Sequence, residues 1–332
     1  MQQLRLDQHE RQPLLRRQHS TGHHHDTLPP PTSSKTRNNQ TIPATDPDAA
    51  TLRFIGTATT ILEWRGFRMM TDPNFLHAGD HVHLGPGVTA TRQTNPAIEL
   101  DALPPLDCIL LSHYHADHFD QHVEEELNRA FPIITTPHAK DCLSAKDEPF
   151  TAVHALDTFE SLVLQKEELS IKITGTPGKH VPPGMLSRAN DLLGAVPPTN
   201  GWILELGKSA DEGVQTGYRI YITGDTLFVD ELKKIPEWLE GKQVDLMLCH
   251  LGGTTIPGPS LPLLMVTMDA KQGIQMITLM NPDTTIPIHF DDYDVFMSPL
   301  DDFKKEVTEA GLDKKVVYLD RGEEFRFKVE SA

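Results

Sequence analysis

Cysteine, aromatic residues and long apolar runs are all scarce in this sequence. Its 332 residues include only three cysteines and 6% Phe, Trp and Tyr. Cys108, Cys142 and Cys249 lie too far apart to suggest a disulfide framework, and they suit a reducing compartment. No stretch approaches the roughly 18 consecutive apolar residues of a membrane-spanning helix. The first residues also lack the apolar run of a secretory signal, so we expect a cytoplasmic protein with no transmembrane segment.

Positive charge is scarce as well. The chain has 30 Lys and Arg against 47 Asp and Glu, which gives a formal net charge of −17, and no block of basic residues stands out. Such an acidic body disfavours non-specific attraction to nucleic acid or to an anionic membrane. The charge therefore favours a small-molecule substrate over nucleic acid, whereas nothing in the sequence indicates an oligomeric state.

The first 49 residues differ in composition from the rest. They combine several prolines, a run rich in Ser, Thr, Asn and Gln, and three consecutive histidines at 23–25. A segment with so few apolar side chains cannot offset the entropy that it loses on folding. We therefore predict a disordered N-terminal tail over residues 1–49 and one catalytic domain over residues 50–332.

Short β-type runs alternate with turn residues from Thr51 onward. Strands are expected at 52–55, 60–64, 67–71 and 316–319, and the apolar run at 108–111 is typical of a buried strand. Helices are expected after Asp120, which could serve as an N-cap, and over 270–280, where Thr267 could cap the start. Dominant strands with helices between them predict an α/β fold whose sheets are covered by helices on their outer faces.

Residues 113–118 read His-Tyr-His-Ala-Asp-His and follow the predicted buried strand. On a helix or a strand these side chains could not all converge. On a loop, His113 and His115 can bind one ion while Asp117 and His118 turn toward a neighbouring one. Imidazole and carboxylate are ligands that Zn²⁺ accepts in open catalytic sites. The alternative is a histidine-rich surface loop.

This motif resembles the His-X-His-X-Asp-His signature of the metallo-β-lactamase superfamily. In that family three further ligands follow in chain order, each after a strand. The matching residues here are His180, Asp225 in a Thr-Gly-Asp-Thr turn, and His289 after Ile-Pro-Ile. Taken singly, each histidine could be a core residue and Asp225 a turn residue. The resemblance covers nearly all of residues 51–329 and implies an αββα sandwich of two mixed sheets with outer helices.

The resemblance also implies how the ligands divide between two divalent metal ions. The first ion is expected on His113, His115 and His180, the second on Asp117, His118 and His289, with Asp225 bridging them. Zinc suits this set of ligands, and manganese or iron would also fit. The implied reaction is hydrolysis by a metal-bridging hydroxide, which Asp117 orients before it passes a proton to the leaving group.

Two further segments resemble one branch of the superfamily, which contains ascorbate-6-phosphate lactonase and N-acyl phosphatidylethanolamine phospholipase D. They are residues 56–63 and the sequence Thr-Asp-Pro at 71–73. In that branch Asp72 is placed to orient a ligand histidine from behind. A turn aspartate before proline is the alternative. The phospholipase's lipid-binding features and the nucleases' inserted domain are not recognisable.

Several residues near the motifs could contact a substrate. His250 is a candidate catalytic residue that could donate a proton or hold an oxyanion, or it could be a buried structural histidine. Lys179 could anchor a carboxylate or phosphate, or be solvated. Residues 291–293 could shape the mouth of the site. The proline-bounded apolar stretch at 181–200 could be a lid, or it could be packed permanently against a sheet.

Three functions are compatible with these motifs. The first is a lactonase-like hydrolase of a small carbonyl substrate, that is, a lactone, lactam or ester. The second is a phosphodiesterase of the phospholipase D-like type. The third is a non-catalytic metal-binding protein. The intact set of seven ligands disfavours the third function and the acidic charge disfavours a nuclease, so the sequence favours the first.

Overall fold

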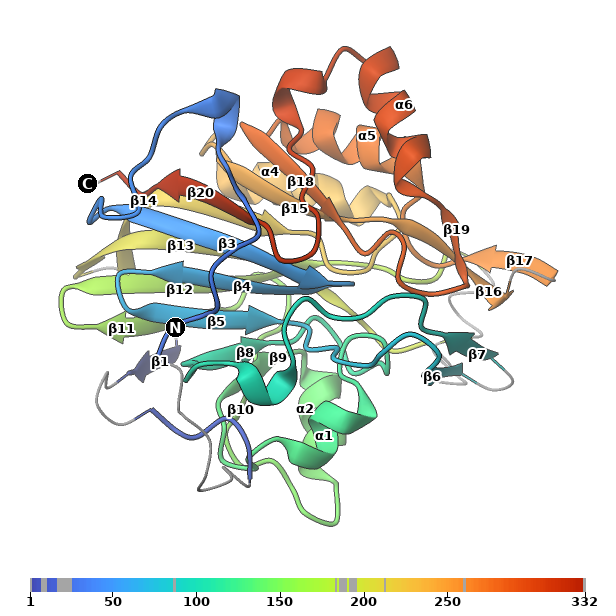
Figure 1. The fold of residues 1–332 in the computed structure, drawn as a ribbon, viewed down its shortest axis with the longest axis horizontal. Helices are drawn as coiled ribbons and strands as arrows, with labels where there is room; N and C mark the ends of the chain where they lie inside the picture. Colours follow the sequence, from blue (N-terminus) through green and yellow to red (C-terminus); the bar gives the residue numbers. More distant parts are fainter. Residues whose placement is uncertain are drawn as a thin grey trace.

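The computed structural model describes residues 2–6, 11–16, 26–85, 88–182, 184, 190, 196–211, 213–258 and 261–330. Two large mixed sheets form its centre (Figure 1). The eight-stranded sheet has the order β10 (Val153–Ala155), β9 (Ile133–Thr135), β8 (Cys108–Leu110), β5 (Phe67–Thr71), β4 (Thr59–Trp64), β3 (Ala49–Gly56), β20 (Glu324–Lys328) and β2 (Ser34–Lys35). The seven-stranded sheet has the order β1 (Gln2–Arg5), β11 (Ser161–Lys166), β12 (Leu169–Pro177), β13 (Asn200–Ala210), β14 (Gly213–Ile222), β15 (Leu246–His250) and β18 (Thr284–Ile288).

Helices cover the outer face of each sheet. In Figure 1, α1 (Gln121–Glu126) and α2 (Pro137–Ser144) lie below, whereas α4 (Lys234–Leu239), α5 (Ala270–Met280) and α6 (Leu300–Glu309) lie above. Two small sheets stand at the right-hand edge: β6 (His81–Gly85) with β7 (Val88–Thr91), and β16 (Gly252–Gly258) between β17 (Leu261–Met265) and β19 (Phe296–Ser298). This arrangement confirms the predicted sandwich.

Both faces of the eight-stranded sheet are buried. Leu62 and Met69 pack with the residues of the other sheet, whereas their chain neighbours Ile61 and Met70 pack in the core that includes Val123 of α1. Successive side chains of a strand point to opposite faces, so burial on both faces requires continuous apolar runs. This explains why Met69 and Met70 are both apolar, as are all three residues of β8.

Two local predictions were wrong. The N-cap of α5 is Asp269, whose carboxylate accepts a hydrogen bond from the amide of Gln272. The hydroxyl of Thr267 instead bonds the hydroxyl of Thr254, in the neighbouring strand β16. The run at 316–319 forms no strand, because only Val316 makes a single bridge to the edge strand β18.

The described parts of the N-terminal segment contact the rest of the protein. Strand β1 pairs with β11, and β2 pairs with β20. Leu14 is 5% exposed among the apolar residues beneath α1, and Arg11 forms an ion pair with Asp107 at 2.9 Å. These placements differ from the expected disordered tail, because partners across the fold supply contacts that composition does not reveal. The division of the chain at residue 49 stays a prediction.

No helix in the described part of the chain is long and apolar enough to cross a membrane.

Candidate metal centre

Six strands bring metal-capable side chains to one edge of the sandwich. In the eight-stranded sheet β5 and β8 are parallel, and in the other sheet β12, β14, β15 and β18 all run the same way. Since the carboxyl ends of strands with the same direction meet at one edge, the loops that follow them converge. The side chains at these ends are Asp72, the 113–118 motif, His180, Asp225, His250 and His289.

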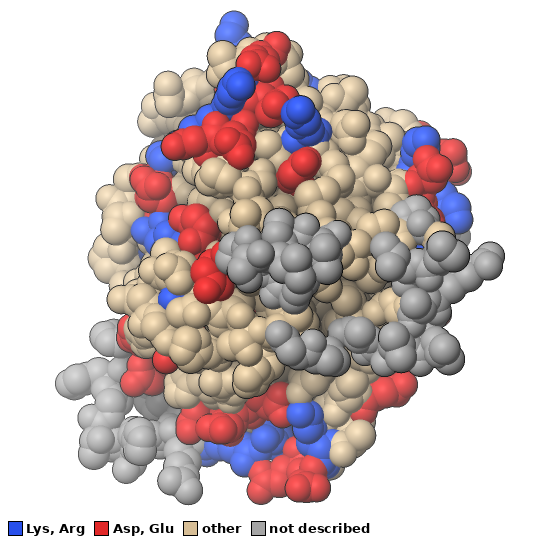
Figure 2. Space-filling view, turned by 90° about the vertical axis from the view of Figure 1, so that its right-hand side faces the viewer, with Lys and Arg blue, Asp and Glu red and all other residues tan. Residues whose placement is uncertain are grey.

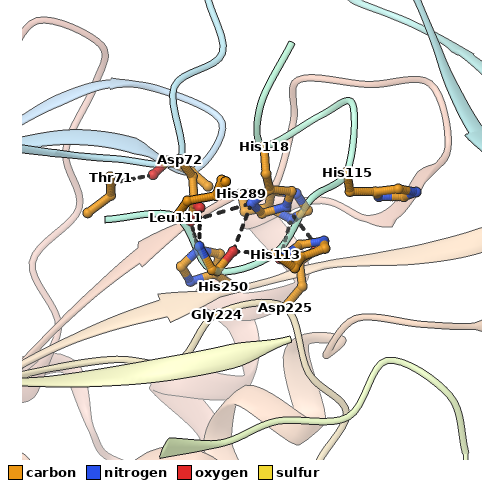
Figure 3. Close-up of polar contacts among 12 residues, drawn as sticks. Thr71, Asp72, Leu111, His113, His115, His118, Gly224, Asp225, His250 and His289 are labelled. Carbon is orange, nitrogen blue, oxygen red and sulfur yellow. Dashed lines mark hydrogen bonds and ion pairs between the residues drawn. The ribbon is translucent and has the colours of Figure 1, made fainter. Parts of the chain in front are cut away.

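The seven predicted ligands form overlapping groups whose ligand atoms all lie within 4.8 Å of one another in each group. One group is Asp117, His118, Asp225 and His289; a second is His113, His180 and Asp225; a third is His113, His115 and Asp117. Figure 3 shows His113, His118 and His289 turned toward one another, with His115 at the outer side. Residues separated by up to 176 positions in the sequence are therefore brought together by the fold.

Backbone carbonyls determine which ring nitrogen carries the proton in His180 and His289. The Nδ1 atom of His180 lies 2.9 Å from the carbonyl oxygen of Val266, and that of His289 lies 3.1 Å from the carbonyl oxygen of Leu251. A carbonyl only accepts, so each Nδ1 carries the proton and donates it. The Nε2 atoms that face the cluster are therefore unprotonated acceptors in the neutral rings.

The same rule holds for His115, whose partner is also a carbonyl, whereas the hydroxyl that faces His113 can either donate or accept. The Nδ1 atom of His113 lies 2.9 Å from the hydroxyl of Ser112, and the Nε2 atom of His115 lies 3.2 Å from the carbonyl oxygen of Leu84. The Nε2 atoms of His113 and His180 are only 3.1 Å apart. Nε2 of His180 is an acceptor, so this contact is either a hydrogen bond from a protonated Nε2 of His113 or a place where both nitrogens bind a cation.

Buried polar atoms without a hydrogen bond give an independent test of whether a metal fits. They include His115 Nδ1, Asp117 Oδ1, His118 Nε2, Asp225 Oδ1 and His289 Nε2. Burying a polar atom without a partner is unfavourable, and native proteins contain few such atoms. These all face one another, so the residues present fit divalent cations.

The pKa values of the candidate ligands shift in different directions, according to burial and the neighbouring charges. Burial lowers the pKa of His113 well below its usual value and that of His180 to about 4, so both rings stay neutral. Burial alone would raise the pKa values of Asp117 and Asp225, but the neighbouring histidines hold both well below their usual range. Burial alone would lower the pKa values of His118 and His289, but Asp225 and the neighbouring carboxylates raise both. The centre thus offers neutral imidazoles at His113 and His180 beside ionised carboxylates, which attract the positive charge of a divalent metal.

Asp72 lies behind the cluster, as its position after β5 suggested. Its Oδ1 atom accepts a hydrogen bond of 2.7 Å from the amide of Ser112, and its Oδ2 atom is 3.4 Å from Nδ1 of His118. It has a φ of 33°, in the left-handed region that non-glycine residues rarely adopt. This geometry places Asp72 where it orients the ring of His118.

His250 is fully buried and lies next to Asp72, on the far side of the cluster from His115 in Figure 3. Its Nε2 atom is 3.8 Å from Oδ2 of Asp72, and its Nδ1 atom is 3.3 Å from the hydroxyl of Thr223. It does not line the space over the ligands. The position favours a buried structural histidine over a proton donor.

The other residues that the sequence suggested as substrate contacts do not share one environment. The amine of Lys179 forms an ion pair of 2.7 Å with Glu231. Asp292 and Tyr293, expected at the mouth, are buried behind the ligand loops instead. Most of the predicted lid at 181–200 lies outside the described residues. Asn74 and Arg92, which contact these loops from behind, carried no sequence signal because their partners are distant in the chain.

Two packed mixed sheets with a His and Asp cluster at their strand ends define a metal-dependent enzyme of the metallo-β-lactamase fold. The sequence model described as "Beta-lactamase superfamily domain" matches residues 81–290. The chain belongs to this superfamily, and it is a metal-dependent hydrolase.

Curated relatives carry the name "UPF0173 metal-dependent hydrolase". The protein of Salinibacter ruber is 24% identical over 265 residues, which cover 80% of this chain and 95% of the relative. The protein of Archaeoglobus fulgidus is 26% identical over 221 residues, which cover 67% of this chain and 82% of the relative.

Solved structures share the fold at lower sequence identity. An isothiocyanate hydrolase from Delia radicum gut bacteria has a TM-score of 0.65 at 19% identity and covers 84% of this chain and 99% of its own. A possible metal-dependent hydrolase from Veillonella parvula has a TM-score of 0.65 at 17% identity and covers 82% of this chain and 98% of its own.

Proposed function

We propose that this hydrolase carries two divalent metal ions and acts on a small uncharged carbonyl substrate, that is, a lactone, lactam or ester. The observation that carries the proposal is a cluster of seven candidate ligands, six of them buried, in which five side chains have a buried polar atom without a hydrogen bond. The narrower resemblance to the lactonase and phospholipase branch is compatible with this reaction.

Asp225 divides the ligands into two sets. The proposal assigns His113, His115 and His180 to the first ion and Asp117, His118 and His289 to the second. Asp225 shares ligand groups with both sets, since its Oδ2 atom is 3.1 Å from Nε2 of His118 and 3.7 Å from Nε2 of His180. Zinc is the preferred metal for these ligands, with manganese or iron as alternatives. Two such ions would lower the pKa of a bound water and polarise the substrate carbonyl.

Asp117 is the residue best placed to move the proton. Its Oδ1 atom lies 2.8 Å from Nδ1 of His115 without a hydrogen bond of good geometry, and the side chain lines the space over the cluster. A carboxylate there can accept the proton of the attacking water and return it to the leaving group.

The space over the cluster has apolar walls formed by Leu84, Val196, Ile256 and Val266. It measures only about 10 Å³, which is room for a single water. A neighbouring cavity of about 420 Å³ shares His180 and Val196 with it. We assign the non-reacting part of the substrate to this second cavity, so that only the carbonyl group reaches the ligands.

The charges of this face agree with an uncharged substrate. Figure 2 shows the side that carries β6, β7, β16 and β17: its described centre is largely uncharged, and Lys and Arg are mixed with Asp and Glu toward the periphery. No Lys or Arg among the described residues lines the space over the cluster, and Lys179, which lines the neighbouring cavity, is paired with Glu231. A phosphodiester gains much of its binding from such cations, so this site favours a neutral carbonyl.

The test combines metal analysis with a substrate panel. The panel contains small lactones, a β-lactam, a phenyl ester, a phosphodiester, RNA and an isothiocyanate, because a protein of similar fold hydrolyses isothiocyanates. We expect about two ions per chain, carbonyl hydrolysis that a chelator abolishes and zinc restores, and a KM that depends only weakly on salt. Efficient cleavage of RNA or the phosphodiester with no activity on any carbonyl compound would establish the phosphodiesterase instead. One ion or none in folded, metal-treated protein would reject the two-metal centre.

A further inference from the structure

A buried arginine lies behind the ligand loops. Arg92 follows β7 and is 1% exposed. Its guanidinium is 3.1 Å from Oδ1 of Asp292, and it donates hydrogen bonds to the hydroxyl of Thr57, to Oδ1 of Asn74 at 3.2 Å and to the carbonyl oxygen of Thr94 at 2.9 Å. We call Arg92, Asp292, Thr57 and Asn74 the Arg92 cluster.

One route from the Arg92 cluster leads to Asp117. The amide nitrogen of Asn74 donates to the backbone carbonyl of Asp117 at 2.9 Å and to the hydroxyl of Tyr293 at 2.6 Å. Because Arg92 donates to the oxygen of the same amide, the amide can present only its nitrogen to Asp117. Arg92 therefore fixes the orientation of the Asn74 side-chain amide, which donates a hydrogen bond to the backbone of Asp117.

A second route leads to His289. The amide of His289 donates to the carbonyl oxygen of Thr57 at 2.8 Å, and the amide of Thr57 donates to Oδ2 of Asp292 at 2.7 Å. Thr57 and His289 have φ values of 50° and 60°, a conformation that β-branched residues such as threonine avoid. Two contacts stabilise this strained conformation of Thr57: Arg92 donates a hydrogen bond to its hydroxyl, and Asp292 accepts one from its amide.

We propose that Arg92 is a positioning residue of the metal centre, which fixes Asp117 and His289 together through Asn74 and Thr57. It touches neither the ligand atoms nor the substrate space. Both residues that it positions belong to the ligand set of the second ion, so this inference rests on the division of ligands in the proposed function. Loss of Arg92 should therefore weaken the second ion more than the first.

The experiment compares Arg92→Gln with a matched control, Arg53→Gln. Arg53 is also buried, at 4% exposed, and pairs with Glu324 at 3.1 Å, but it contacts no residue of the metal centre. Asp292 keeps Arg321 as a partner at 2.7 Å in the first variant, so no buried carboxylate is left without a cation. A third variant, Arg92→Met with Asp292→Asn, removes both charges if the single variant does not fold.

The measurement is the affinity of each ion, from chelator competition with zinc, and the visible spectrum of the cobalt-substituted protein. We expect the second ion to bind at least ~10-fold more weakly in the Arg92 variants, with an altered cobalt spectrum and little change for the first ion. Arg53→Gln should lower the melting temperature and leave both affinities as in the wild type. Arg92 variants with wild-type affinities, or with both ions weakened equally, would overturn the proposal.

The wild-type titration separates this inference from the proposed function. If the wild type binds only one ion, the two-metal centre fails. Arg92 is then tested on that ion, whose affinity must still fall about 10-fold in the Arg92 variants and stay unchanged in Arg53→Gln. If it does not fall, the positioning role fails as well.

Discussion

At the residue scale, the orientation of three candidate histidines depends on a backbone carbonyl outside the cluster. The carbonyl oxygens of Leu84, Leu251 and Val266 take the proton of one ring nitrogen and leave the other free to bind a metal. Because a hydrogen bond on the far nitrogen fixes both the tautomer and the ring angle, the backbone positions the ligands before any ion binds.

The two sets of ligands can be separated by single substitutions. His180→Ala should mainly reduce the occupancy of the first ion, and His289→Ala mainly that of the second, because each removes one nitrogen from one set. Elemental analysis after equilibration with metal at a limiting concentration, together with cobalt spectra, measures this. His122→Ala, on the exposed side of α1, is the control and should retain both ions. Equal loss of both ions in the two variants would argue against the division at Asp225.

At the scale of elements, the seven-stranded sheet carries a charged cluster across three strands. Glu205 of β13 lies opposite Lys172 of β12 and Arg219 of β14 in the strand register. Its carboxylate is 3.1 Å from the amine of Lys172 and 2.8 Å from the guanidinium of Arg219. Opposite charges that face each other across strands stabilise the register of the sheet.

This cluster should make stability depend on pH on the acid side. Burial alone would raise the pKa of Glu205, but its hydrogen bond from Arg219 and the charge of Lys172 hold it below the usual 4.5. A carboxyl with a lowered pKa in the folded state contributes stability that is fully present above 4.5 and is lost as the pH falls through the lower, folded value.

Glu205→Gln should therefore cost about 2 kcal/mol of unfolding free energy near pH 7 and less as the pH falls below 4.5. Urea denaturation at a series of pH values measures this dependence. Glu309→Gln, on the exposed side of α6, is the control and should change little at any pH. If the variant and the wild type lose stability in parallel below pH 4.5, the charged cluster does not contribute as described.

At the scale of the whole molecule, the N-terminal segment packs on the domain but contacts none of the ligands in the described residues. Its contacts include Leu14 in the core beneath α1 and the carbonyl oxygen of Pro29, which accepts from Arg53. Removing such contacts affects the stability of the sheets that carry the loops, and leaves the ligand atoms in place.

Deletion of residues 1–48 should therefore lower the melting temperature and leave metal content unchanged. Loss of the buried Leu14 side chain alone corresponds to about 2 kcal/mol. Calorimetry and elemental analysis of the shortened protein measure the two effects. An unchanged melting temperature would support residues 50–332 as a domain that needs no N-terminal segment. Loss of metal would show that the segment supports the centre.

The sequence by itself determined the candidate ligands and the class of fold. The motif at 113–118 places four metal-capable side chains within six residues, and His180, Asp225 and His289 each follow an apolar run. These sequence patterns are local, because a motif and the apolar run before it involve only neighbouring residues. The patterns therefore identify which side chains lie at the strand ends along one edge of the sheets.

Apart from Asp72, only the tertiary structure decided which residues support the candidate ligands from behind. Arg92 and Asp292 are separated by 200 positions, and neither belongs to a recognisable motif. Likewise Arg11 pairs with Asp107, which lies 96 positions away in the chain. A buried ion pair forms where the fold brings two charged side chains within a few ångströms of each other and shields them from water. Because this depends on how distant sheets and loops pack together, no single stretch of the sequence reveals it.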